Sequence, residues 1–91
     1  MALITLDAIE AARQRIAGTA VRTPLVRLET GSTGPEIFLK LENLQPINSF
    51  KLRGAANAIA MLAPEQRGLG VWTVSAGNAG QGVAYAGRRA G

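Results

Sequence analysis

The stretch from Asn48 to Ala55, Asn-Ser-Phe-Lys-Leu-Arg-Gly-Ala, constrains this chain most, because it has the features of a helix N-terminus. Asn48 or Ser49 can accept hydrogen bonds there from backbone N–H groups that have no helical partner. Apolar residues then recur every three or four positions, which predicts a helix over 49–63 with one apolar face. These residues are Leu52, Ala55, Ala56, Ile59 and Leu62 or Ala63.

The charges in the first turn of this helix are unusual. Lys51 and Arg53 lie where the positive end of the helix dipole favours acidic residues. Residues that break a local rule often mark functional sites. The same dipole disfavours the ammonium form of Lys51, and a lysine that attacks a carbonyl must be an unprotonated amine. The alternative, and the commoner case for a lysine at a helix start, is a solvated surface side chain.

The rest of the chain predicts an α/β fold. Helix, strand and helix joined by short links have a βαβ-type order, which indicates a segment of parallel sheet after an N-terminal helix and a hairpin. The predicted elements are a helix over 6–17 between an N-cap at Thr5 and a stop at Gly18, hairpin strands over 21–28 and 36–42, a loop over 43–48, the helix over 49–63 ended by Pro64, a strand over 71–75, and a helix from Asn78 to Arg88.

A second motif lies where the strand over 71–75 meets the last helix. It reads Ser-Ala-Gly-Asn-Ala-Gly-Gln-Gly over 75–82. Ligands of open parallel sheets collect at the carboxyl ends of strands, and a helix N-terminus offers N–H groups to an anion. The glycine spacing differs from the dinucleotide fingerprint and lacks the Lys-Ser/Thr of a P-loop, which argues against a nucleotide site. A glycine-rich turn that only lets helix and strand pack closely is the alternative.

Together, Ser-Phe-Lys-x-Arg-Gly-Ala and the later Ser-x-Gly-Asn-x-x-Gln resemble the fold-type-II pyridoxal-phosphate enzymes. The similarity extends from about Leu6 to Gly91 and is strongest to the threonine/serine dehydratases, with serine racemase as a near relative. It implies an incomplete piece of a tryptophan-synthase-β-like fold and pyridoxal 5'-phosphate as the cofactor. The implied reaction is β-elimination of threonine or serine to a 2-keto acid and ammonia.

The resemblance also implies roles for single residues. Lys51 would be the Schiff-base lysine and the base that takes the α-proton of the substrate. Phe50 would lie beside the cofactor ring, although a core position under the helix is an equal alternative. Asn78 matches the asparagine that hydrogen-bonds the ring hydroxyl oxygen. The loop that grips the substrate carboxylate matches Ser75, Gly77, Asn78 and Ala79.

Three other positions carry further information. Arg53 is expected to be a structural pairing residue, with no direct catalytic role. Ala79 stands where the family usually has a histidine, which leaves the substrate preference open. Ala76 stands where racemases of this group tend to carry a serine, which favours a dehydratase over a racemase. A serine racemase or another lyase or synthase of the family is the alternative.

The family binds the cofactor phosphate and the pyridine nitrogen with segments that lie far downstream of such motifs. We therefore expect residues 1–91 to be a single N-terminal fragment of the catalytic region, inactive by itself and part of a homo-oligomer at full length. A non-catalytic module that pairs with another chain through its incomplete sheet is the alternative from a different functional class.

Composition excludes several other functions. The chain has no cysteine and no histidine, which removes disulfides, thiolate metal sites and the commonest general base. The net charge is +4, but the basic residues are scattered without interleaved aromatic residues, which argues against a nucleic-acid surface. No apolar segment is long enough to span a bilayer, and no signal-peptide pattern is present, so we expect no membrane partner and a cytoplasmic protein.

Overall fold

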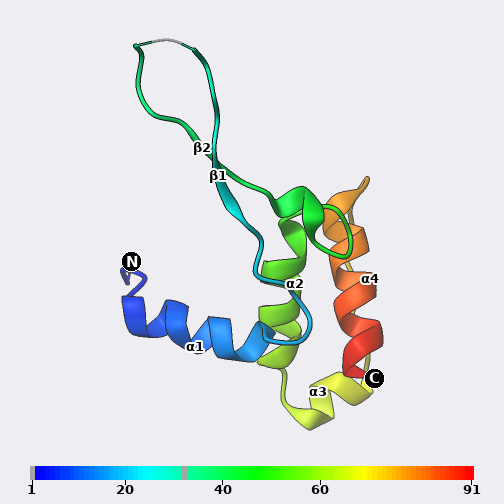
Figure 1. The fold of residues 1–91 in the computed structure, drawn as a ribbon. Coiled ribbons are helices and arrows are strands. Elements are labelled where there is room, and N and C mark those ends of the chain that lie inside the picture. Colours follow the sequence, from blue (N-terminus) through cyan, green and yellow to red (C-terminus); the bar gives the residue numbers. More distant parts are fainter. Residues whose placement is uncertain (1, 32) are drawn as a thin grey trace.

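The computed structural model describes residues 2–31 and 33–91 and combines helices with one two-stranded hairpin (Figure 1). This confirms the predicted mixture of helix and strand, but the described residues contain no parallel sheet. In chain order the elements are α1 (Leu6–Ile16), β1 (Leu25–Arg27), β2 (Phe38–Lys40), the 3-10 turn η1 (Glu42–Leu44), α2 (Lys51–Ala60), α3 (Pro64–Gly68) and α4 (Asn78–Ala90).

Helix α1 begins and ends where the sequence predicts. The Thr5 hydroxyl accepts a hydrogen bond from the Ala8 N–H at 3.1 Å. Gly18 follows the last turn with a φ of 86°, a conformation that glycine adopts without strain. Of its predicted apolar face, Ile16 is buried, whereas Leu6 and Ile9 are 71% and 54% exposed. The described residues therefore cover the C-terminal end of this face and leave the other end open to solvent.

Strands β1 and β2 form the predicted antiparallel hairpin, with Val26 opposite Leu39 at its centre. The strands are shorter than the predicted ranges 21–28 and 36–42. In Figure 1 the hairpin extends away from the helices, and all residues of both strands are exposed. A two-stranded hairpin that nothing covers is only marginally stable, which accounts for the limited pairing.

Helices α2 and α4 form the core, side by side and in the same direction (Figure 1). Near their starts, a Cβ atom added to Gly82 would lie 3.1 Å from the Lys51 carbonyl oxygen. Near their far ends, a Cβ on Gly87 would lie 3.9 Å from the Ile59 side chain. Both N-termini therefore face one end of the helix pair. The predicted apolar stripe is confirmed at Leu52, Ala56 and Ile59, which are buried. The helix is shorter than the predicted range 49–63 and ends at Ala60, so Leu62 and Ala63 lie beyond it.

The strand predicted over 71–75 is wrong, because these residues pair with no described strand. These residues nevertheless run along α4. Val71 lies beside Gly87, and Ser75 lies beside Gly80, so the segment returns along α4 from its end towards its start. Seven helical residues rise about 10 Å. Four backbone steps of a helix would cover only about 6 Å, so the segment is more extended than a helix. Trp72 and Val74 of this segment are 87% and 89% exposed.

Helix α3 was not predicted as a helix. The sequence indicated only that Pro64 ends the preceding helix, and α2 does end before it, at Ala60. Proline is favoured at the first helical position because its missing N–H would have no helical partner there. The Gln66 side chain accepts a hydrogen bond from the Ala63 N–H at 2.9 Å, which stabilises this second start. In the described part of the chain, no helix is long and apolar enough to cross a membrane.

Candidate functional site

Lys51 is the first residue of α2, and its side chain is exposed. The N-cap of α2 is Phe50, not Ser49 or Asn48, but the Ser49 hydroxyl does accept a hydrogen bond from the Lys51 N–H at 3.2 Å. The Lys51 ammonium lies 5.1 Å from the centroid of the Phe50 ring, which is the geometry of a cation–π contact. Phe50 is 59% exposed, so the alternative of a core position for this ring is wrong.

The second group of predicted site residues surrounds the start of α4. Asn78 is the first helical residue, and Ser75, Gly77 and Asn78 are exposed, while Ala79 is half-buried. The Ser75 hydroxyl accepts a hydrogen bond from the Gly77 N–H at 3.1 Å, which shapes the turn into the helix. The first N–H groups of an α-helix have no acceptor within the helix. Those at the start of α4 can therefore bind an anion.

These two groups lie at the same end of the α2–α4 pair. Gly82 is one helical turn beyond Asn78, and it packs against the carbonyl group of Lys51. The structure thus brings the backbone of Lys51 next to the first turns of α4. It shows no hydrogen bond between the Lys51 amine and any residue in 2–31 or 33–91, and Lys51 is exposed, so the amine is accessible to solvent.

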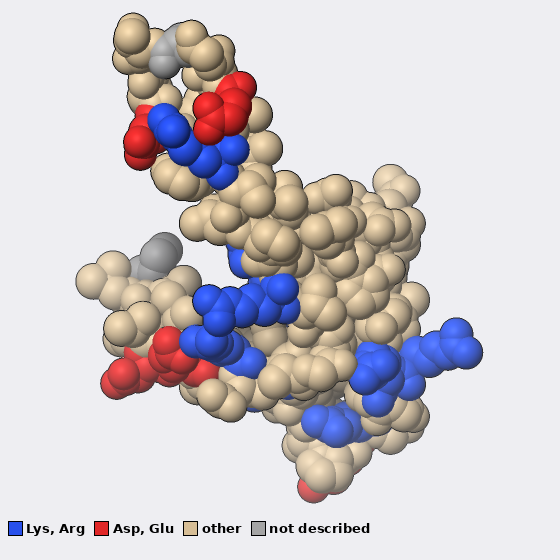
Figure 2. All heavy atoms as spheres, viewed as in Figure 1, with Lys and Arg blue, Asp and Glu red and all other residues tan. Residues whose placement is uncertain are grey.

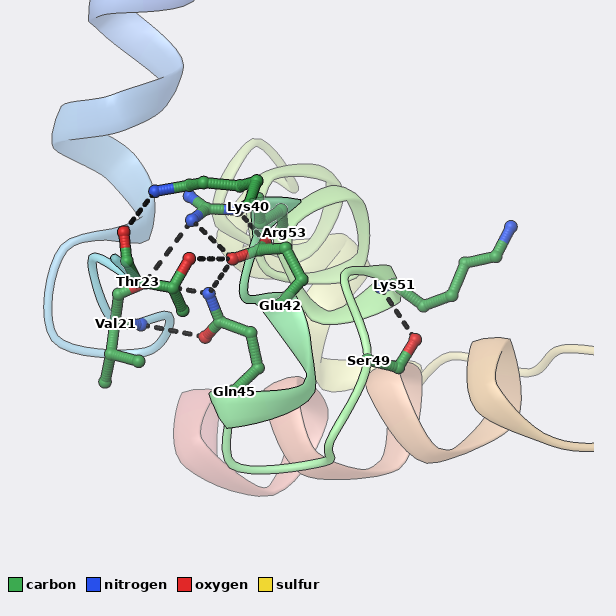
Figure 3. A network of polar contacts seen from close by, with 8 residues as sticks. All are labelled: Val21, Thr23, Lys40, Glu42, Gln45, Ser49, Lys51 and Arg53. Atoms are coloured by element: carbon green, nitrogen blue, oxygen red, sulfur yellow. Dashed lines mark hydrogen bonds and ion pairs between the residues drawn. The ribbon is translucent and has the colours of Figure 1, made fainter. Parts of the chain in front are cut away.

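On the other side of α2, Arg53 forms a two-point ion pair with Glu42 of η1 (Figure 3). Its Nε donates to Oε1 of Glu42, and its Nη2 donates to Oε2 at 3.1 Å. The expected pairing role of Arg53 is confirmed. Hydrogen bonding by the Arg53 guanidinium is the main cause that lowers the pKa of Glu42 from 4.5 to about 2, and Glu42 in turn raises the pKa of Arg53. Sequence reasoning did not single out Glu42, because nothing local marks it as the partner.

The ion pair belongs to a larger polar network. Oε2 of Glu42 also accepts hydrogen bonds from the Thr23 hydroxyl at 2.5 Å and from Nε2 of Gln45 at 3.1 Å. Gln45 is 1% exposed, and its amide group bonds both the N–H and the C=O of Val21, at 2.9 and 2.7 Å. The network therefore joins the segment before β1 to η1 and to the first turn of α2.

A hollow of about 760 Å³ lies on this same side, between α1 and α2. Its floor is apolar, with Ile9, Ile16 and Val21 among the lining residues, and Lys51 is not part of it. Figure 2 shows Lys and Arg side chains gathered between α1 and the hairpin, and Arg22 and Arg53 line the hollow there. The exposed amine of Lys51 and this hollow are thus separate features.

Comparison with known proteins identifies the family. Residues 16–91 match the family model described as pyridoxal-phosphate dependent enzyme. The chain belongs to this family. It is 49% identical over 86 residues to the L-threonine ammonia-lyase of Thermotoga maritima, covering 92% of this chain and 21% of that protein. It is 47% identical over 85 residues to the biosynthetic L-threonine dehydratase of Corynebacterium glutamicum, covering 91% and 20%. It is 44% identical over 88 residues to the serine racemase of Dictyostelium discoideum, covering 94% and 27%.

This pyridoxal-phosphate family member spans 20–27% of the length of these curated relatives. Its residues fit the cofactor in kind: the amine of Lys51 is accessible, the exposed ring of Phe50 lies beside it, and the N–H groups that begin α4 lie at the same end. Within the described ranges, no group of three His, Cys, Asp or Glu residues could hold a metal ion.

Proposed function

We propose that this chain is the lysine-bearing N-terminal part of the catalytic region of a pyridoxal-phosphate-dependent lyase that acts on threonine or serine. The observation that carries the proposal is the position of Lys51. Lys51 has an exposed side chain and is the first residue of α2, which starts at the same end of the helix pair as α4. The relatives named for threonine dehydration and threonine ammonia-lyase chemistry support the substrate class.

Each residue has a proposed role. Lys51 would hold the cofactor covalently through Nζ, and its free amine would serve as the base for the α-proton of the substrate. Phe50 and Asn78 would help to hold the cofactor, Phe50 through its ring and Asn78 through a hydrogen bond from its side chain. When bound, the cofactor supplies an electron sink that stabilises negative charge at the substrate α-carbon. The groups proposed to bind the substrate carboxylate belong to Ser75, Gly77, Asn78 and Ala79.

The first experiment tests Lys51 itself. The sequence contains only two lysines, Lys40 and Lys51, so each can be followed separately by peptide mapping. The Lys40 ammonium donates a hydrogen bond to the Thr23 carbonyl, whereas the Lys51 amine is accessible. After incubation with pyridoxal phosphate and reduction with borohydride, we expect the label to concentrate on Lys51. Equal labelling of both lysines and the N-terminal amine would contradict the proposed role.

The second experiment tests the reaction. In the Thermotoga maritima L-threonine ammonia-lyase, the matched segment is replaced by these 91 residues, and release of 2-keto acid from threonine and serine is measured. We expect activity that Lys51→Arg abolishes and that the matched control Lys40→Arg retains. Because Ala76 favours a dehydratase, keto-acid release should exceed racemisation of serine. Dominant racemisation would support the serine racemase alternative.

We also propose that residues 71–75 become a strand of a parallel sheet in the tryptophan-synthase-β-like fold when a neighbouring strand is present. The segment already runs back along α4, and its exposed residues Trp72 and Val74 are the ones that a sheet would cover. The same exposed surface is the observation that favours the second candidate, a non-catalytic module that docks on another chain. Unselective labelling together with self-association of the chain would favour that module.

A further inference from the structure

The first turn of α2 carries two cations with opposite surroundings. Successive helical residues are rotated by about 100°, so Lys51 and Arg53 leave the helix on nearly opposite sides. Figure 3 shows this arrangement, with Arg53 directed into the polar network and Lys51 directed away from it. Leu52, between them, is 0% exposed. A rotation of the first turn would therefore redirect the Lys51 amine and also break the contacts of Arg53 and Leu52.

The partner of Arg53 is itself held rigidly. The Glu42 side chain is 15% exposed, and its carboxylate accepts hydrogen bonds from Arg53, Thr23 and Gln45. A two-point pair between a guanidinium and a carboxylate fixes direction as well as distance, which a single hydrogen bond does not do. Since the pKa of Glu42 is lowered to about 2, this carboxylate stays charged at every pH at which an amine can attack an aldehyde.

The backbone between Glu42 and Lys51 is also restrained. The Asn48 N–H donates to the Gln45 carbonyl at 2.7 Å, and Asn48 takes a φ of 61°, a conformation that few residues other than glycine adopt. Ser49, next along the chain, is buried and accepts the Lys51 N–H. The loop that leads into α2 is thus held at Gln45, at Ser49 and, through Arg53, at Glu42.

We infer that Glu42 and Arg53 are positioning residues for Lys51, and that their two-point pair sets the rotation of the first turn of α2 and so directs the Lys51 amine towards the start of α4. The inference rests on the proposed role of Lys51. Gly82 of α4 packs on the Lys51 carbonyl, so the backbone that carries the amine is held by α4 as well as by the Glu42–Arg53 pair.

The test measures labelling of Lys51 in the 91-residue chain, in a Lys40→Arg background. Pyridoxal phosphate is the probe, borohydride fixes the link, and peptide mapping gives the ratio of label on Lys51 to label on the N-terminal amine. Glu42→Gln keeps the size of the side chain and removes its charge, whereas Arg53→Lys keeps the charge and removes the two-point geometry. We expect each to lower the ratio about tenfold, since small displacements of a reacting group have effects of this size or larger.

A matched control separates positioning from general loss of stability. Ile59→Val weakens the core at the far end of α2, and Ile59 is buried outside the network. All variants are labelled under conditions in which circular dichroism shows them folded, and Ile59→Val should keep the wild-type ratio. If Glu42→Gln does not fold, Arg53→Lys is used for the test. As a second measurement, hydrogen exchange of the Lys51 N–H should be faster in this variant than in the parent chain.

The outcomes distinguish the two proposals. The inference is supported if the parent chain is labelled preferentially at Lys51 and this preference is lost in Glu42→Gln or Arg53→Lys but kept in Ile59→Val. The inference is overturned if both Glu42→Gln and Arg53→Lys keep this labelling preference, or if Ile59→Val loses it to the same extent. The proposed function remains intact in either case. No preference for Lys51 in the parent chain overturns the proposed function and the inference with it.

Discussion

Gly82→Ala tests the contact that brings α4 next to Lys51. The added Cβ would lie 3.1 Å from the carbonyl oxygen of Lys51, 3.3 Å from its carbonyl carbon and 3.4 Å from the Cβ of Ala55. The first two atoms belong to the backbone of α2, so they cannot rotate aside as the end of a flexible side chain can. The two helices must therefore separate by a few tenths of an ångström.

The magnitude follows from two opposing terms. Replacing glycine by alanine inside a helix stabilises it by about 1 kcal/mol. Forcing an extra methyl group into a close contact costs about 1–3 kcal/mol. Gly87→Ala is the matched control in the same helix, because its Cβ would meet its nearest neighbours, on Val71 and Ile59, at the ordinary distances of 3.8 and 3.9 Å. We therefore expect Gly82→Ala to be less stable than Gly87→Ala by about 1–3 kcal/mol.

The assay is urea and thermal unfolding of the parent chain and both variants, followed by circular dichroism. In a domain of this size, 1 kcal/mol corresponds to about 4–8 °C in melting temperature, so the two variants should be clearly separated. Gly87→Ala should also unfold at or above the parent midpoint. A Gly82→Ala variant as stable as Gly87→Ala would show that the start of α4 does not approach Lys51 as described, and would refute this reasoning.

Three further predictions concern stability. The pKa of Glu42 is 4.5 when unfolded and about 2 when folded, so its stabilisation is present above pH 4.5 and is lost as the pH falls towards 2. The Arg53 side chain is 36% exposed, so solvent screens the ion pair and the stabilisation is smaller than the full pKa shift of Glu42 would give. We expect Glu42→Gln to lower the free energy of unfolding by ~2 kcal/mol at pH 7 and by little near pH 2. Equal losses in urea unfolding at both pH values would contradict this. Leu52→Ala should cost about 2–5 kcal/mol, because Leu52 is fully buried. Phe50→Ala, at an exposed neighbouring position, should cost less than about 0.5 kcal/mol. Urea midpoints that rank the two variants in the opposite order would contradict this description of the core. Thr5→Ala should cost about 1 kcal/mol through loss of the α1 cap, and an unchanged thermal midpoint would argue against that cap.

The sequence by itself determined the features that depend on near neighbours. Thr5, Gly18 and Ser49 mark helix ends through contacts within three residues, and the apolar spacing behind Ser49 gives α2 its buried stripe. Pairing between the residues around Val26 and Leu39 follows from two apolar segments joined by a turn cluster. The motif around Lys51 also indicated the family that the comparison confirmed.

Only the tertiary structure decided which residues meet across the chain. It selected Glu42 as the partner of Arg53, left Phe50 exposed beside the Lys51 amine, and placed the starts of α2 and α4 at one end of the core. It also left 71–75 unpaired although this segment has strand composition. A helix satisfies its backbone hydrogen bonds internally, so its ends can be found from local residues. A strand or a long-range ion pair requires a partner that local sequence does not specify.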